Sequence, residues 1–230
     1  MSFGQNLQFL RKMRNKMTQE ELAERMRVSR QTVSKWELDV AYPEMSKVIE
    51  LCTFFSCSMD QLIREDMNVS DEAYSDIRIQ CIAPFWYIRY AVVSSSPEDD
   101  AKNHVKDMAY KTGITEPHMI GWDFPVVSQE QINIFNMHGY TAALVFHNDK
   151  EKTNIDEEIM YQEAQNYLAI TIKQPFIAPF RLIPNAYKLL RTYMKTNGIN
   201  EKHEKSIIDC FEKEYIIDGV DYMDVYIAIE

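Results

Sequence analysis

The chain has 230 residues, a formal net charge of −10 at pH 7, 46% apolar residues and 26% charged residues. These values are close to the average of soluble globular proteins, and the presence of only six glycines and eight prolines excludes collagen-like and low-complexity chains. No apolar stretch approaches the roughly 18 residues that a membrane helix needs, and the N-terminus lacks a charged-then-apolar signal pattern. We therefore expect a cytoplasmic protein of one large or two small domains, with no membrane partner.

The cysteines and histidines indicate neither a disulfide framework nor a metal site. The four cysteines are too few and too scattered for a chain of this length, and the five histidines show no metal-ligand spacing. We predict no metal and no cofactor.

Charge is distributed unevenly along the chain. Residues 1–64 contain ten Lys and Arg and eight Asp and Glu, a net charge of +2. The remaining 166 residues contain fifteen basic and twenty-seven acidic residues, a net charge of −12. A chain with this overall negative charge is a poor partner for nucleic acid. Only the N-terminal part has a net charge that is compatible with DNA. Its basic residues include a close group at Arg11, Lys12, Arg14 and Lys16.

Residues 1–64 show apolar positions at helical spacing in five short segments. Thr18 and Glu21 form a capping box that opens the second segment, and Ser29 caps a third helix over residues 30–37. Because only a short link at Arg27 and Val28 separates these two helices, they must cross steeply. The pattern predicts a helix-turn-helix within a five-helix domain.

The third helix carries residue types that recognise DNA on the side away from Val33 and Trp36. This polar face consists of Arg30, Gln31, Thr32, Ser34 and Lys35. Arg pairs with guanine, Gln with adenine, and the Thr methyl packs on thymine. Gln19, at the start of the preceding helix, is placed to meet a phosphate. Each residue alone is typical of a solvated surface, and it is the combination that predicts DNA binding.

The strings MTQEELA at residues 17–23 and VSRQTVSKWE at residues 28–37, followed by Pro43, resemble the XRE/Cro-type helix-turn-helix family. In that family the Gln of helix two meets a phosphate and the first residues of helix three read the major groove. The resemblance implies these roles for Gln19 and for the polar face, and packing roles for Trp36 and Glu37. Residues 38–42 depart from the Gly- or Asn-rich loop of the family, and Asp39 is a poor neighbour for phosphate.

Residues 67–76 belong to an acidic stretch that is sparse in apolar side chains and predicts a linker, either a flexible tether or a short helix. We therefore place a DNA-binding domain at residues 1–66 and a second domain at residues 77–230.

The second domain shows one order of elements twice, about 85 residues apart. Strand-like residues 77–94, a helix at 98–112 and strand-like residues 118–124 and 140–147 come first. The same order recurs at 167–173, 183–196, 207–215 and 222–229. The predicted fold class is α plus α+β: a five-helix helix-turn-helix domain followed by a duplicated strand–helix–strand–strand domain. We expect one mixed sheet with both helices on one face and a groove on the other.

Two carboxylates and several aromatic residues are candidates for lining this groove. Glu212 and Glu214 share one face of the strand at 207–215. An acid beside aromatic rings holds an organic cation by Coulomb attraction and cation–π contact. The aromatic candidates are Trp86, Trp122, Tyr140, Tyr215 and Tyr226. The alternative is that these rings pack in the core and that the acids lie on an exposed edge strand.

The end of the chain, with Phe211-Glu212, Tyr215 and the string YMDVYIAI at residues 222–229, resembles the GyrI-like effector-binding domain. The resemblance implies a small effector, often hydrophobic or cationic, contacted by Glu212. Glu214 stands two residues further on, and Ala228 replaces a common Pro. The sequence therefore leaves the choice between Glu212 and Glu214 open.

Together these patterns predict a sequence-specific transcriptional regulator that binds double-stranded operator DNA as a homodimer and responds to a small-molecule effector. Two alternatives stand beside it. The second domain is a small-molecule hydrolase with Glu212 or Glu214 as base, or it is a ligand-free dimerisation or partner module. No nucleophile elbow, Ser-His-Asp spacing or phosphate-binding loop favours an enzyme.

Overall fold

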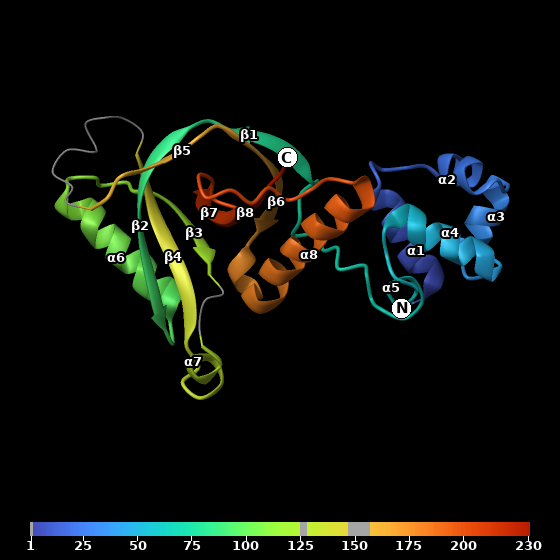
Figure 1. Cartoon of the computed structure of the whole chain (residues 1–230), viewed down its shortest axis with the longest axis horizontal. Coiled ribbons are helices and arrows are strands. Elements are labelled where there is room, and N and C mark those ends of the chain that lie inside the picture. Colours follow the sequence, from blue (N-terminus) through green and yellow to red (C-terminus); the bar gives the residue numbers. More distant parts are fainter. Residues whose placement is uncertain (1, 125–127, 147–156) are drawn as a thin grey trace. The chain divides into compact units, whose positions relative to one another are not determined.

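The computed structural model describes residues 2–124, 128–146 and 157–230 (Figure 1). These residues form two compact units. Unit 1 comprises the chain up to Tyr74 together with Pro179–Glu201 and Glu230, and unit 2 comprises Ser75–Ala178 and Lys202–Ile229. The predicted boundaries at residues 66 and 77 stay a prediction, because grouping by contact does not show which segments fold as independent modules.

Unit 1 is helical, and the five predicted N-terminal helices are present in it. Its helices are α1 (Phe3–Met13), α2 (Gln19–Met26), α3 (Arg30–Glu37), α4 (Met45–Phe55), α5 (Met59–Ile63) and α8 (Pro179–Asn197). The capping box at Thr18 is confirmed, because its hydroxyl accepts a hydrogen bond from the Glu21 N–H and the Glu21 carboxylate accepts one from the Thr18 N–H. Ser29 caps α3 by accepting from the Thr32 N–H at 3.1 Å. The link between α2 and α3 turns at Arg27, which has a left-handed φ of 54°.

The core of the N-terminal helices is formed by the residues that follow the helical period. Helix α3 contributes Val33 and Trp36, which pack against α1 and α2. The fully buried side chains include Leu7, Leu10, Leu22, Met26, Leu51, Phe55 and Leu62. Each such side chain stabilises the fold by roughly 1.5–3 kcal/mol relative to an exposed one. Burial on this side directs the polar face of α3 away from the core.

Helices α1 and α3 approach each other closely at Gly4. A Cβ atom built on Gly4 would lie 2.5 Å from the backbone oxygens of Trp36 and Glu37, so no larger residue fits without movement. The Gly4 N–H also donates to the carboxylate of Asp39 at 2.9 Å. Asp39, which the sequence marks as a poor neighbour for phosphate, therefore caps the N-terminal turn of α1.

Helix α8 and the segment after α5 are bound to the N-terminal helices within unit 1. The Asn6 side chain donates to the Glu65 carbonyl at 2.7 Å and accepts from the Met67 N–H at 3.2 Å. At the C-terminal end of α8, the Asn197 amide donates to the Met13 carbonyl at 2.9 Å, and the Tyr193 hydroxyl donates to Asn15 at 2.8 Å. Unit 1 therefore combines sequence segments that lie more than a hundred residues apart.

Unit 2 is an eight-stranded sheet with the order β1-β6-β8-β7-β3-β4-β2-β5. The strands are β1 (Arg78–Ile82), β2 (Phe85–Ser94), β3 (His118–Asp123), β4 (His138–Phe146), β5 (Met160–Gln162), β6 (Gln165–Lys173), β7 (Cys210–Ile217) and β8 (Val220–Ala228). The other elements are helices α6 (Pro97–Lys111) and α7 (Gln129–Asn133) and the 3-10 helix η2 (Pro175–Ile177).

The expectation of a mixed sheet is wrong for the residues that the structure describes. Every strand pair among them is antiparallel. The reason is that β4 lies between β2 and β3, and β8 lies between β6 and β7, so the two strands joined by each helix are never neighbours. The segment predicted as one strand over residues 77–94 is two strands that break at Pro84, which has no N–H for a ladder bond. His147, the end of another predicted strand, lies outside the described residues.

The two faces of the sheet have separate apolar clusters. Helix α6 places Ala101, Val105 and Ala109 against one face, where they pack with Ile88 of β2 and Leu144 of β4. The opposite face carries a cluster that includes Tyr87, Tyr167, Phe211 and Tyr226. Across the described residues, none of the helices combines the length and apolar character required to span a bilayer.

Replacing Gly4 with Ala tests the close approach of α1 and α3. Alanine normally stabilises a helix by roughly 0.5–1 kcal/mol relative to glycine. Here we expect the opposite sign, a loss of about 1–3 kcal/mol, because α1 must move away from α3. The measurement is native-state hydrogen exchange at the amides of both helices. Gln8→Ala, an exposed change on the same helix, is the control and is expected to alter stability by less than about 0.5 kcal/mol. A Gly4→Ala protein as stable as the parent would contradict the close approach.

Candidate functional site

Within unit 1, the outer face of α3 is accessible to a binding partner. The side chains of Arg30, Gln31 and Lys35 are exposed, and those of Thr32 and Ser34 are half-buried. The Thr32 hydroxyl shares a hydrogen bond of 2.9 Å with Ser29, which leaves its methyl group for apolar contact. The structure thus brings these five predicted residues together on one helix.

The position of α3 is fixed by the carboxylate of Glu37, which is almost completely buried. Arg11 donates to it from Nε at 2.6 Å and from Nη2 at 3.0 Å. Gln19, the predicted phosphate contact, donates its amide to Glu37 Oε2 at 2.8 Å. The third donor group of Arg11 reaches the Met17 carbonyl at 2.5 Å. A single carboxylate therefore joins the C-terminal ends of α1 and α3 to the N-terminal end of α2.

Arg11 and Arg14, the two arginines of the basic N-terminal group, are buried or half-buried in contacts within unit 1. Arg11 is buried in the pair with Glu37. The Arg14 guanidinium stacks on the Phe54 ring, 4.2 Å from its centroid, and donates to the carbonyls of Phe54 and Thr196. The exposed positive charges of this domain are consequently fewer than the sequence indicates.

A cavity of about 180 Å³ lies in unit 2 on the face of the sheet that α6 covers. Its walls come from α6, β3, β4 and β7. The lining residues are Lys102, Lys106, Pro117, Met119, Ile120, Gly121, Tyr140, Glu212 and Glu214. Glu212 is paired in register with Gly121, where β7 meets β3 and the two halves of the sheet join.

Acidic and basic groups meet in this cavity around the ring of Tyr140. The Lys102 ammonium donates to Glu214 and, at 2.5 Å, to Glu98. It also lies 5.7 Å from the centroid of the Tyr140 ring. Burial alone would lower the pKa of Lys102, but the hydrogen bonds and charges of Glu214 and Glu98 outweigh it and raise the pKa above its ordinary value. Lys102 is therefore charged at neutral pH.

Tyr140 has an environment that keeps its hydroxyl protonated. Burial raises its pKa far above the usual value, and the carboxylate of Glu212 raises it further. The end of the ring occupies the space that a side chain at position 121 would need, since a Cβ built on Gly121 would be 2.1 Å from the Tyr140 hydroxyl oxygen. Gly121 is thus required for the shape of the cavity.

The predicted effector residues divide between the two faces of the sheet. Glu212, Glu214 and Tyr140 line the cavity on the α6 face, and the shared face of the two acids is confirmed. Trp122 packs against the opposite cluster, and the strand period places Tyr215 on that opposite face as well. The expected groove on the face without helices is therefore not where the acids lie. The sequence could not establish this because it gives the alternation of a strand but not which face the helix covers.

Tyr215 and Tyr226 take part in a separate polar network on the opposite face. Both hydroxyls donate to the buried carboxylate of Asp224, at 3.3 and 3.0 Å. Arg78 completes the network with an ion pair to Asp224 at 3.1 Å. Trp86 is not at the cavity either, since its ring lies 4.6 Å from that of Tyr161 in β5.

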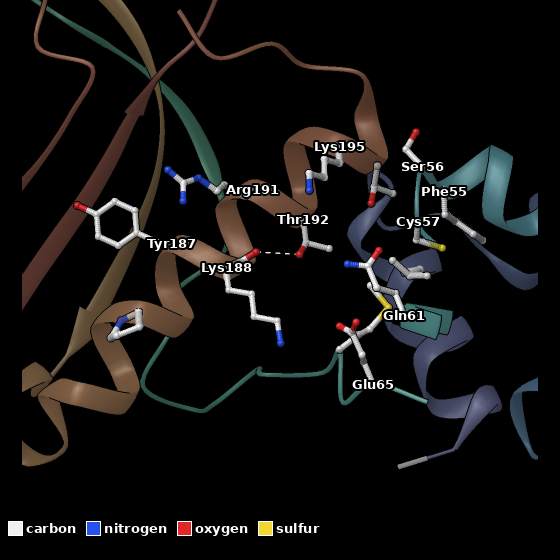
Figure 2. A pocket seen from close by; sticks show the side chains of 14 residues that line it. Phe55, Ser56, Cys57, Gln61, Glu65, Tyr187, Lys188, Arg191, Thr192 and Lys195 are labelled. Carbon is white, nitrogen blue, oxygen red and sulfur yellow. Dashed lines mark hydrogen bonds between the residues drawn. The ribbon is translucent and has the colours of Figure 1, made fainter. Parts of the chain in front are cut away.

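A second cavity, of about 290 Å³, lies in unit 1 between α8 and the N-terminal helices. Figure 2 shows Lys188, Thr192 and Lys195 projecting from α8 on one side and Cys57 and Gln61 on the other. The Thr192 hydroxyl donates to the Lys188 carbonyl at 2.8 Å. The Lys188 ammonium donates to the Asp66 carbonyl at 3.1 Å.

Comparison with known proteins identifies the N-terminal helices. A family model described as helix-turn-helix, HTH_3, matches residues 7–62. These residues form a helix-turn-helix domain. The HTH-type transcriptional activator BcrR of Enterococcus faecalis is 44% identical over 63 residues, which are 27% of this chain and 30% of that protein. The match thus spans less than a third of this curated relative.

Comparison with solved structures gives matches that cover about two thirds of this chain or more. The crystal structure of the EcmrR C-terminal domain is 12% identical with a TM-score of 0.48 and covers 67% of this chain and 97% of its own. SAV2435 bound to tetraphenylphosphonium is 10% identical with a TM-score of 0.40, over 68% and 94%. The EcmrR–DNA complex is 13% identical with a TM-score of 0.48, over 96% and 80%. At these identities and TM-scores, the similarities assign no function to this chain.

Sequence reasoning missed Lys102, Lys106 and Gly121. Glu98 and Lys102 stand four residues apart, which is typical of an ordinary surface pair on a helix. Nothing local distinguishes such a pair from one that faces a cavity. Among the described residues, no group of three or more His, Cys, Asp or Glu side chains is placed to hold a metal ion.

A double-mutant cycle tests the contact between Gly121 and Tyr140. Gly121→Ala alone is expected to destabilise β3 and β4 by about 1–3 kcal/mol, because its Cβ displaces the buried ring. Tyr140→Leu removes the obstructing atoms, so the double variant is expected to lose less stability than the sum of the two single variants. Hydrogen exchange at β3 and β4 amides measures the three differences. Strict additivity would show that the ring does not cross Gly121.

Proposed function

We propose that this chain is a sequence-specific DNA-binding transcriptional regulator whose sheet domain binds a small organic cation. The observation that carries the proposal is the exposed polar face of α3 in a helix-turn-helix domain. The apolar face of the same helix and the Glu37 carboxylate at its C-terminal end are buried. A surface with Arg, Gln, Thr, Ser and Lys on one short helix fits the edges of base pairs in the major groove.

The residues of this surface have distinct roles in the proposal. Arg30, Gln31 and Thr32, at the N-terminal end of α3, read base edges. Ser34 and Lys35 contact base edges or the neighbouring phosphates. Gln19 binds a phosphate through its backbone N–H at the start of α2, while its side-chain amide stays on Glu37. The protein binds as a homodimer on two half-sites, because one short helix reads too few base pairs for specificity.

The effector is proposed to bind in the α6 cavity. Glu212 and Glu214 supply negative charge, and Tyr140 supplies an aromatic face, which together favour an organic cation over a neutral molecule. The predicted effector contacts Trp86, Trp122, Tyr215 and Tyr226 do not line this cavity, and their role stays a prediction. Both Glu212 and Glu214 line this cavity, so the choice between them as the ligand contact stays open.

A duplication is part of the proposal for the sheet domain. In each half the last strand lies between the strand before the helix and the strand after it. This gives the spatial orders β2-β4-β3 and β6-β8-β7. The two halves meet where β3 pairs with β7, and this is the position of Glu212. A site at the junction of two related halves is one that neither half builds alone.

Helix α8 is the proposed route from the effector to the DNA-binding domain. By contacts it belongs to unit 1, where Arg14 and Asn197 join it to α1 and α4. By chain order it directly precedes β7, which carries Glu212 and Glu214. An effector that binds β7 differently in two conformations shifts the placement of α8, and the coupling is reciprocal.

One observation favours the alternative function, in which the sheet domain is a dimerisation or partner module that binds no ligand. The Lys102 side chain, which belongs to the same unit, occupies part of the cavity between Glu214 and Tyr140. A cavity filled by its own side chains is the mark of such a module. Binding of an organic cation separates the two proposals.

Gln31→Ala tests the reading of bases. The full chain is first used to select its site from a random-sequence DNA library. On that site we expect Gln31→Ala to lose about 1–3 kcal/mol of binding free energy, with relaxed preference at one base-pair position. Gln8→Ala, on the exposed side of α1, serves as the control. An equal loss on all DNA sequences would assign Gln31 to a phosphate.

Operator affinity tests the effector half of the proposal. Saturating benzyltrimethylammonium, a small aromatic cation, is expected to change the affinity of the full chain for the selected site by about fivefold or more. In Glu212→Gln, the same shift is expected to require at least about tenfold more ligand, because a carboxylate is replaced by a neutral amide. Fluorescence anisotropy of labelled DNA gives both numbers. An unchanged affinity at a concentration shown by calorimetry to saturate the protein would remove the coupling.

A further inference from the structure

The ammonium group of Lys102 lies where a cationic ligand of this cavity would be expected to lie. It donates to Glu214 and to Glu98, and it lies 5.7 Å from the Tyr140 ring centroid. Its side chain is only 17% exposed. The carboxylate and the aromatic face that would recognise a foreign cation are therefore engaged by a cation of the protein itself.

We propose that Lys102 is a resident cation that an effector must displace from Glu214 and from the face of Tyr140, and that it thereby determines which cations bind. The inference rests on the proposed function of the α6 cavity as a cation site. It assigns Lys102 as a specificity-determining residue, in competition with the ligand.

Displacement leaves no unpaired buried charge, because Lys102 has two acidic partners on different elements. Glu98 stands one turn earlier on α6, four residues before Lys102, and its side chain is 46% exposed. Glu214 stands on β7. When a ligand takes Glu214, the flexible lysine stem keeps its ammonium on Glu98 at the water-exposed side. The exchange replaces one ion pair of Glu214 by another, so its electrostatic cost is small.

The competition selects for cations that offer more than charge. A small hydrated ion gains no more from Glu214 than the tethered ammonium does, and it lacks the advantage of being held at the site. A cation with aromatic or apolar surface also gains contact with Tyr140 and with the apolar lining residues Met119 and Ile120. The cavity therefore favours lipophilic organic cations over inorganic ones and over primary ammonium compounds.

Lys106 provides a matched control for the charge effect. It projects from the next turn of α6 and lines the same cavity, and within the described part of the chain it forms no ion pair. Removing Lys106 changes the net charge as much as removing Lys102 does, but it frees neither Glu214 nor Tyr140.

Isothermal calorimetry of the full chain with benzyltrimethylammonium tests the proposal, with neutral benzyl alcohol as the ligand control. We expect Lys102→Met to bind the cation at least about tenfold more tightly than the parent, because the competitor is gone. Lys106→Met is expected to gain less than about threefold, through screened Coulomb attraction alone. Lys102→Arg, which keeps a cation at the position, is expected to gain nothing.

Three outcomes would overturn the proposal in distinguishable ways. Equal affinity in the parent and Lys102→Met would remove the displacement but leave the cavity a cation site. Equal gains in Lys102→Met and Lys106→Met would show that only net charge matters. Absence of binding to all variants, including the parent, would remove the effector half of the proposed function together with this inference.

A measurement on the parent protein avoids any folding defect of the variants. The ¹H–¹⁵N signal of the Lys102 ammonium, assigned by its loss in Lys102→Arg, is expected to shift or broaden on saturation with the cation. The Lys106 signal is expected to move less. A Lys102 signal that stays unchanged at saturation contradicts displacement.

Discussion

The carboxylate of Glu37 is the group on which the placement of the polar face of α3 depends. It is buried at the end of α3 and accepts from Arg11 on α1 and from Gln19 on α2. A buried charge of this kind is stable only while its partners are in place, and removing one partner typically costs about 3–5 kcal/mol. Three helices consequently share one electrostatic constraint, and the direction of the polar face of α3 is a result of it.

The basic residues of this domain divide into buried or half-buried ones and exposed ones. Arg11 and Arg14 point inward, one to a carboxylate and one to an aromatic ring and two carbonyls. Arg30 and Lys35 point outward. Counting basic residues in the sequence gives the charge of the domain but not its surface potential. The exposed positive charge of the domain is therefore smaller than the count indicates.

Local patterns were sufficient to predict the N-terminal helices and their caps. Helix capping depends on residues three positions apart, and the signals at Thr18 and Ser29 are of this kind. The polar face of α3 follows from the helical period for the same reason. Gly4 and Asp39 were not predictable as contacts, because they meet only when α1 and α3 have packed.

In the sheet, the local pattern predicted correctly that two acids share a face, but the prediction that this face carries no helix was wrong. Strand alternation correctly placed Glu212 and Glu214 on one face. Which face that is depends on the pairing of β7 with β3 and on the position of α6, and both are non-local. The ion pair between Lys102 and Glu214 joins residues 112 positions apart. No spacing rule in the sequence connects them.

Strand β7 lines the α6 cavity and is the next strand after helix α8 in the chain. Glu212 and Glu214 belong to this strand, and α8 ends at Asn197, shortly before the strand begins. A ligand changes DNA affinity only if it interacts differently with two conformations of the protein. The two pairing states that we propose for Lys102, with Glu214 or with Glu98 alone, would be a difference of this kind in unit 2. The contacts of Arg14 and Asn197 with α8 are the corresponding element in unit 1. Regulation by an organic cation therefore requires that releasing Glu214 alter the path of the chain between β7 and α8, which makes that short connection, and not the cavity alone, the element that decides whether binding is transmitted.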